Sequence, residues 1–134
     1  MKAVFDMNVL IAAFLTEGIC AKLLIRARRR DFDLILYDGI LQEFKGVLQK
    51  KFATSLHETP EALIILSEAA LEIHGRTDSI TPICRDSDDD LILACARDAV
   101  ADYLVTGDED LLVLKNYEGI SILNPTEFEK LFSD

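Results

Sequence analysis

The stretch Y-L-V-T-G-D at residues 103–108 is typical of a buried strand that leads through a glycine to an acidic side chain. The N-terminus has a similar arrangement, because the apolar run at residues 3–5 ends at Asp6. In an open parallel sheet, the carboxyl ends of the strands and the amino ends of the following helices share one edge, where ligands bind. The two stretches therefore predict an α/β fold with acidic residues on one edge of its sheet.

Two further acidic residues follow the same rule. Glu43 lies one turn into the helix expected after the apolar run 34–37, and Asp90 opens the helix expected over residues 91–96. Carboxylates gathered at one edge repel each other unless a cation is present, and hard divalent ions prefer oxygen ligands. The sequence therefore predicts a site for one or two Mg²⁺ or Mn²⁺ ions, with four carboxylate ligands: Asp6, Glu43, Asp90 and Asp108.

The rest of the chain alternates between strand and helix patterns. Strands are predicted at 2–6, 34–37, 102–105 and 120–123, and a short edge strand is expected within 76–87. Helices are predicted at 8–14, 18–30, 39–52, 59–73, 88–99, 108–114 and from residue 125, where N-P-T-E gives a cap, a proline and a glutamate three residues later. Thr16 is expected to cap the second of these helices. This order predicts a three-layer α/β/α fold with a central parallel sheet of four or five strands.

Length and composition favour a single domain over residues 1–134. The formal net charge of −10 argues against nucleic-acid binding by the whole surface. No apolar run approaches the ~20 residues that a membrane span requires, and the N-terminus has no signal-peptide pattern. Cys20 and Cys95 lie in apolar helical stretches and are expected in the core. With an odd count of three cysteines, the sequence predicts a reduced, cytoplasmic setting.

Basic residues are nevertheless clustered, at Arg26, Arg28–Arg30 and Lys45, with Lys50 and Lys51 further on. One interpretation is that these cations stabilise the carboxyl ends of helices and keep the surface solvated. The other is that they form a local phosphate-binding flank beside an acidic metal site. The sequence leaves both open.

Each acidic residue also has a local structural interpretation, which for Glu43 is a glutamate at the rim of the core. Asp6 can cap the next helix, although Asn8 can do so as well. Asp90 ends the run D-S-D-D-D at residues 86–90, in which Ser87 and Asp90 resemble a capping box, and Asp88 and Asp89 are interpreted mainly as charges at a helix terminus. Asp108 can cap after a glycine turn, and Asp110 either shares the metal or caps.

Four strings, in this order and spacing, resemble PIN-domain ribonucleases. They are V-F-D-M-N-V-L at 4–10, Q-E-F at 42–44, D-D-D-L-I-L-A-C-A at 88–96 and Y-L-V-T-G-D-E-D-L-L at 103–112. The resemblance is closer to the subgroup of toxin components of toxin–antitoxin systems, and it extends to the helix start at 124–128. Each string alone is a weak signal, whereas the ordered set is fairly specific.

The resemblance implies a metal-dependent ribonuclease that hydrolyses phosphodiester bonds of single-stranded RNA. The family's acidic quartet maps onto Asp6, Glu43, Asp90 and Asp108, and its supporting polar residues map onto Asn8 and Thr106, with Asp110 as a further supporting residue. An antitoxin protein and a homodimer or higher assembly are the implied partners. One position departs from the family pattern, because Met7 stands where a threonine or serine is usual.

Three other functions fit parts of the pattern. A catalytically silent PIN-like binding or scaffold module is compatible with Met7 and with the acidic composition. A phosphatase with an aspartyl nucleophile would use Asp6, but that pattern requires a second aspartate at the position of Asn8. A response-regulator receiver domain would need a lysine at the end of a late strand, where this chain has Thr106 and Asn124.

Overall fold

The computed structural model describes residues 1–51, 58–75 and 87–132. In these residues, the strands form a six-stranded sheet in the order β3-β2-β1-β4-β6-β5. Five strands are parallel: β1 (Lys2–Phe5), β2 (Asp33–Tyr37), β3 (Ala70–His74), β4 (Tyr103–Val105) and β6 (Ile120–Leu123). A sixth, β5 (Asn116–Tyr117), pairs antiparallel with β6 at the edge. The predicted α/β class is confirmed.

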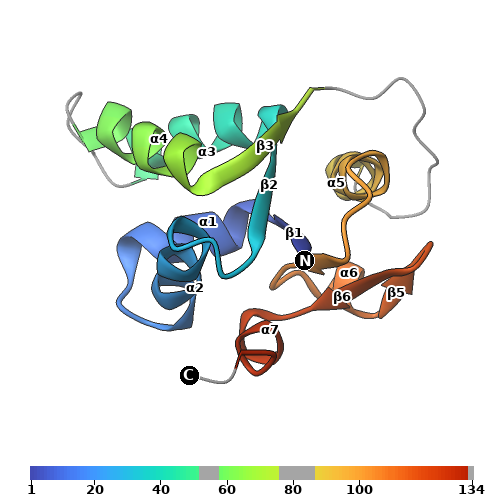
Figure 1. Ribbon diagram of the computed structural model, residues 1–134. Coiled ribbons are helices and arrows are strands. Elements are labelled where there is room, and N and C mark those ends of the chain that lie inside the picture. The colour runs from blue at the N-terminus through green and yellow to red at the C-terminus, as the bar shows by residue number, and fades with distance from the viewer. Residues whose placement is uncertain (52–57, 76–86, 133–134) are drawn as a thin grey trace.

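Helices cover both faces of this sheet, which confirms the three-layer prediction (Figure 1). They are α1 (Met7–Leu15), α2 (Ile19–Arg28), α3 (Asp38–Lys51), α4 (Glu58–Ala69), α5 (Ser87–Asp98), α6 (Glu109–Leu112) and α7 (Pro125–Glu129). Figure 1 shows α1 and α2 on one side of β1 and β2, and α5 on the other. The helix α5 contacts β1, β2 and β4, whereas α7 packs on α2 and β6.

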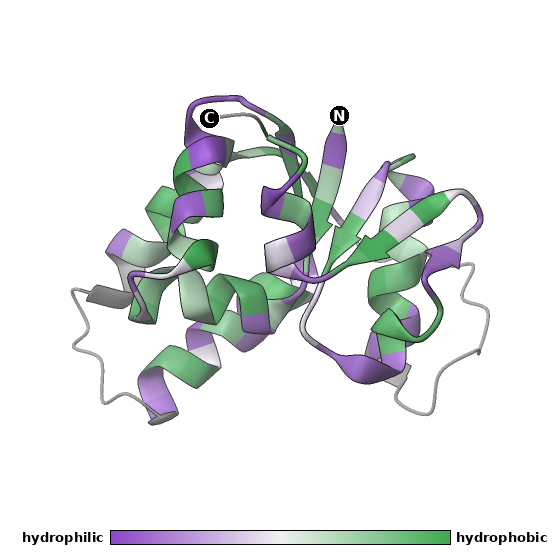
Figure 2. Cartoon of the chain, turned by 90° about the horizontal axis from the view of Figure 1, so that it is seen from below, coloured by the Kyte–Doolittle hydropathy of each residue, from purple (hydrophilic) through white to green (hydrophobic). Residues whose placement is uncertain are grey.

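The core forms because the central strands are apolar on both faces. Ala3, Val4 and Phe5 of β1 are fully buried. The rings of Phe32 and Phe128 meet edge to face at 5.0 Å, and Phe5 lies 5.5 Å from Phe32. Figure 2 shows hydrophobic residues along the strands and hydrophilic residues gathered in the connecting turns. Burial of apolar side chains is the main contribution to the stability of the fold. It also holds β1 and β4 in place, and with them the sheet edge at which both strands end.

The helix predicted over 59–73 is wrong in its last part. The helix α4 ends at Ala69, and β3 follows without a break. Along β3, half-buried residues alternate with exposed Leu71 and Ile73, which is the period of a strand. Parallel pairing with β2 therefore prevails over the helical continuation. The edge strand expected within 76–87 falls largely on residues 76–86, which lie outside the described residues.

The helix ends show one correct and one wrong prediction. Asn124 and Glu127 form the predicted capping box, in which each side chain accepts a hydrogen bond from the other residue's backbone N–H. Thr16, by contrast, does not cap α2. It ends α1, its hydroxyl donates to the carbonyl oxygen of Ala12 (2.7 Å), and Gly18 precedes α2 instead.

Cys20 and Cys95 carry free thiols. Cys95 is buried on α5, and burial raises the pKa of its thiol to about 12, with a smaller contribution from Asp98. It is a core residue, as predicted. Within the described ranges, no single helix has both the length and the apolar character to cross a membrane, although α1 and α2 pass that test jointly across a 98° bend.

Candidate active site

Asp6 is the junction between β1 and α1. It caps α1, and its Oδ1 accepts a hydrogen bond from the backbone N–H of Met7 (2.8 Å). Its Oδ2 accepts a second bond from the hydroxyl of Thr106 (2.8 Å). Asn8, the alternative cap, lies exposed in the first turn of α1 instead. Both oxygens of Asp6 are therefore held, and the backbone of Met7 supplies one donor despite the missing hydroxyl at that position.

Thr106 is fully buried at the end of β4 and connects two acidic residues. Its hydroxyl donates to Asp6 and accepts a hydrogen bond from the backbone N–H of Asp108 (3.0 Å). Asp108 caps α6, and its Oδ1 accepts from the backbone N–H of Asp110 (2.9 Å). The predicted residues Asp6, Thr106, Asp108 and Asp110 thus form one continuous polar chain at the carboxyl edge of the sheet.

The first turn of α5 adds two buried carboxylates. Asp89 and Asp90 are only 7% and 5% exposed. Carboxylate oxygens of Asp89, Asp108 and Asp110 lie within 4.8 Å of one another, a group that could hold a metal ion. Burying carboxylates is costly unless they are paired or coordinate a cation. This cluster, which we call the aspartate cluster, is therefore the candidate metal centre.

The sequence singled out Asp90 from its run and interpreted Asp89 as a charge at a helix terminus. The structure buries both residues and brings Asp89 into the aspartate cluster. Two adjacent residues of a helix project about 100° apart, since each turn holds about 3.6 residues. The run of aspartates indicated that a carboxylate from this turn of α5 would face the site. The capping pattern alone could not show which aspartate of the run it would be.

Glu43 and Asn8 are placed differently. Glu43 lies on the exposed side of α3, next to buried Phe44, and α3 packs on α1, the helix that Asp6 caps. Neither Glu43 nor Asn8 belongs to the aspartate cluster found among the described residues. Their proposed roles therefore rest on their place at the same edge of the sheet.

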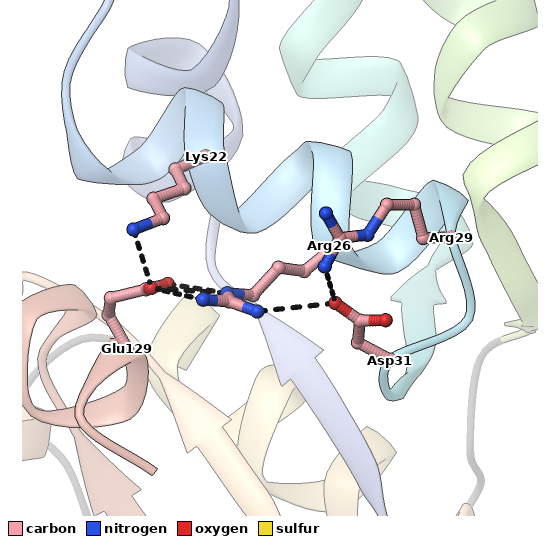
Figure 3. A network of polar contacts seen from close by, with 5 residues as sticks. All are labelled: Lys22, Arg26, Arg29, Asp31 and Glu129. Carbon is pink, nitrogen blue, oxygen red and sulfur yellow. Dashed lines mark hydrogen bonds and ion pairs between the residues drawn. The ribbon is translucent and has the colours of Figure 1, made fainter. Parts of the chain in front are cut away.

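Two residues of the basic cluster, Arg26 and Arg30, have structural roles. Figure 3 shows Arg26 between two carboxylates: its Nε and Nη2 donate to Glu129 (2.9 and 2.7 Å), and its Nη1 donates to Asp31 (3.2 Å). Hydrogen bonds from Arg26 hold the pKa of Glu129 below its usual value. Arg30 donates to the carbonyl oxygens of Ala69 and Glu68, at the end of α4.

The position of this network argues against a phosphate-binding flank made of Arg26 and Arg30. Both residues precede β2 in sequence, so they lie at the edge where the parallel strands begin. The acidic residues lie at the opposite edge, where the strands end. Lys45 is different, because it lies exposed on α3, two residues after Glu43.

Residues 2–110 match the PIN domain family. The chain belongs to the PIN domain family. Among curated proteins, no sequence matches it. A similar solved structure is the crystal structure of VapBC2 from Rickettsia felis bound to a DNA fragment from their promoter, with 17% identity and a TM-score of 0.65. The alignment covers 92% of this chain and 98% of that one. At this identity the likeness concerns the fold.

PIN domains are generally nucleases that use divalent metals. The match includes every residue of the polar chain and of the aspartate cluster, since Asp6 and Asp110 both lie within residues 2–110. It also favours a PIN domain over the phosphatase and receiver interpretations of the same acidic residues. The acidic edge of the sheet is thus the candidate active site.

Proposed function

We propose that this PIN domain is a metal-dependent endoribonuclease that hydrolyses phosphodiester bonds of single-stranded RNA. The observation that carries the proposal is the convergence of the polar chain and the aspartate cluster at one edge of the sheet. The residues proposed to act there are the predicted quartet and supporting residues, with Asp89 added: Asp6, Glu43, Asp89, Asp90, Asp108, Asp110, Asn8 and Thr106.

The donor set fits Mg²⁺ or Mn²⁺. The aspartate cluster offers only carboxylate oxygens, which are the ligands that these hard ions prefer, and offers no sulfur or imidazole. One or two such ions would supply a Lewis acid that activates water and stabilises the leaving oxygen. Asp89, Asp108 and Asp110 would hold the ion.

The remaining residues of the site orient the acidic groups. The hydroxyl of Thr106 and the backbone N–H of Met7 fix the two oxygens of Asp6. Burial of Asp89 and Asp90 excludes water from one side of the site, which strengthens their interaction with a cation. With the net charge of −10, RNA must be attracted locally, by a bound cation and by individual basic side chains.

We further propose that the protein is the toxin of a toxin–antitoxin pair, with an antitoxin protein as partner and a homodimer or higher assembly. The likeness to VapBC2 and the ordered motifs support this. Co-expression with the protein encoded beside it would test the pairing. A stable co-purified complex that suppresses cleavage is expected.

The decisive experiment is cleavage of a panel of single-stranded RNAs with Mg²⁺, Mn²⁺ or EDTA. Cleavage that requires the metal and is lost in Asp108→Asn is expected. Glu109→Gln, at an exposed neighbouring position on α6, is the matched control. If the protein binds RNA but cuts none of it in either metal, it is the silent binding module, and the nuclease proposal fails.

A further inference from the structure

A groove lies between α6, β6 and the start of α7. Its volume is about 510 Å³, and six residues line it: Leu112, Lys115, Ile122, Leu123, Asn124 and Glu127. Ligand sites in proteins are typically ~300–1,000 Å³ and combine apolar walls with a few polar groups. This groove, which we call the β6 groove, has that composition.

The β6 groove is linked to the candidate active site through the backbone. The carbonyl oxygen of Leu123 in its wall accepts a hydrogen bond from the backbone N–H of Thr106 (3.0 Å). Leu112 in the opposite wall donates its N–H to the carbonyl oxygen of Asp108 (2.9 Å). Each wall is therefore joined through the backbone to a residue of the polar chain. The groove and the acidic residues therefore share the carboxyl edge of the sheet, where one polymer chain can contact both.

The polar groups of the groove are already oriented. In the capping box, Oδ1 of Asn124 accepts from the N–H of Glu127 (2.8 Å), and Oε1 of Glu127 accepts from the N–H of Asn124 (3.0 Å). The amide NH₂ of Asn124 and Oε2 of Glu127 are outside these two bonds, so they offer a donor and an acceptor side by side. Lys115 is exposed and adds the one cation among the lining residues.

We propose that the β6 groove binds the nucleotide next to the scissile phosphate of the RNA substrate. Its base packs on Leu112 and Leu123, its polar edge is read by Asn124 and Glu127, and its phosphate is neutralised by Lys115. Single-stranded RNA suits this groove, because unpaired bases can stack on side chains and expose their hydrogen-bonding edges. The inference rests on the proposed nuclease function and adds a determinant of sequence specificity to it.

Three substitutions test the groove while preserving the fold. Asn124→Asp keeps a good helix cap but replaces the NH₂ donor by an acceptor. Glu127→Gln keeps the capping box but turns one acceptor into a donor. We expect each to change the preference for one base beside the cleavage site by about tenfold. Lys115→Gln should weaken binding of all sequences alike.

The matched controls lie in β5 and in the turn that follows it. Asn116→Asp keeps the acceptor for the N–H of Gly119, and Glu118→Gln changes an exposed carboxylate. Both should leave the base preference as in the wild-type protein. Equal base preference in wild type, Asn124→Asp and Glu127→Gln would overturn the proposal even if all three cut RNA.

A second measurement separates the groove from the chemistry. In EDTA, where no cleavage is expected, single-stranded RNA tetranucleotides of varied sequence are titrated into ¹⁵N-labelled protein. Shifts of the Leu112, Lys115 and Glu127 amides support the groove, even for a protein that proves unable to cut RNA. If these amides stay unchanged while cleavage proceeds, the groove proposal fails and the nuclease proposal stands. If they respond to protein concentration alone, the groove is an interface between copies, and the RNA proposal is overturned.

Discussion

The hydroxyl of Thr106 donates a hydrogen bond of 2.8 Å to Oδ2 of Asp6, although the two residues are 100 positions apart in the chain. The bond joins the ends of β1 and β4, which are adjacent parallel strands. The same hydroxyl oxygen of Thr106 accepts a hydrogen bond from the backbone N–H of Asp108. One buried hydroxyl therefore sets the relative position of two proposed site carboxylates.

This relationship predicts that Thr106→Val impairs both stability and cleavage. Valine keeps the shape of the side chain but leaves the N–H of Asp108 and one oxygen of Asp6 without this partner. We expect the free energy of unfolding to fall by about 1–3 kcal/mol, as for a lost buried hydrogen bond. Urea denaturation and single-turnover cleavage measure the two effects. Thr106→Ser retains the hydroxyl and should restore most of both, so equal defects in the two variants would contradict the assigned role.

Metal binding at the aspartate cluster predicts thermal stabilisation. A ligand of the native state at a hundredfold excess over its Kd adds about 2.7 kcal/mol, which raises Tm by several degrees for a chain of this length. Melting in millimolar Mn²⁺, Mg²⁺ and EDTA measures the rise. It should vanish in Asp89→Asn and persist in Glu109→Gln. A wild-type Tm that is indifferent to both metals would argue strongly against a preformed site.

Asp90 gives a prediction of the opposite sign for stability. Several carboxylates crowded at one edge destabilise the metal-free fold, because each raises the cost of ionising its neighbours. Asp90→Asn removes one buried charge and keeps the shape. We expect cleavage to be abolished while stability in EDTA is unchanged or higher. An active Asp90→Asn protein with reduced stability would instead make Asp90 a structural residue of the start of α5.

Two exposed valines differ in their backbone conformation. Substitution by glycine should therefore change the stability of the fold in opposite directions at the two positions. Val100 follows α5 at a φ of 54°, a left-handed conformation that is unfavourable for a β-branched residue, whereas Val113 is helical with a φ of −64°. Val100→Gly should raise the free energy of unfolding by about 1 kcal/mol. Val113→Gly should lower it by up to about 1 kcal/mol. Chemical denaturation of both variants measures the two effects. A Val100→Gly variant that is less stable than the wild type would show that the left-handed conformation of Val100 is not strained.

The link between Arg26 and Glu129 predicts a dependence of stability on pH. Arg26 lowers the pKa of Glu129 below its usual 4.5, so the ionised carboxylate stabilises the fold above that pH and the benefit is lost as the pH falls through the lowered pKa. Glu129→Gln should cost about 1–3 kcal/mol at pH 7 and less at pH 3. Urea denaturation at both pH values measures the difference in unfolding free energy between the wild type and Glu129→Gln. Glu61→Gln, on the exposed side of α4, is the control. If this difference in unfolding free energy is as large at pH 3 as at pH 7, the charge-based explanation is contradicted.

Much of the fold could be predicted because its signals are local. Apolar runs that end at Asp6 and Thr106 mark strands that are buried on both faces, and N-P-T-E at 124–127 marks a helix start. The strand at 70–74 was missed for a nonlocal reason. Its residues continue a helical pattern smoothly, and only pairing with β2, more than 30 residues earlier in the chain, makes them a strand.

The candidate site divides in the same way. Asp6, Thr106 and Asp108 could be placed at one edge because each follows a parallel strand. The choice between Asp89 and Asp90 depends on how α5 is rotated against the sheet, which is set by packing of Ile92, Leu93 and Ala96 and not by the first turn. The pairing of Arg26 could not be predicted either, because its partner Glu129 lies 103 positions away in the chain.

The central place of β1 in the sheet has a consequence for the timing of activity during synthesis. A ribosome that adds about 5–20 residues per second needs about 5–20 s to extend the chain from Asp6 to Thr106. Until then the nascent chain has its first carboxylate but neither the hydroxyl that orients it nor the aspartates of α6. The proposed nuclease centre can therefore form only after residues 106–110 have been synthesised. This leaves an interval in which the proposed antitoxin could bind the nascent chain before the site is complete.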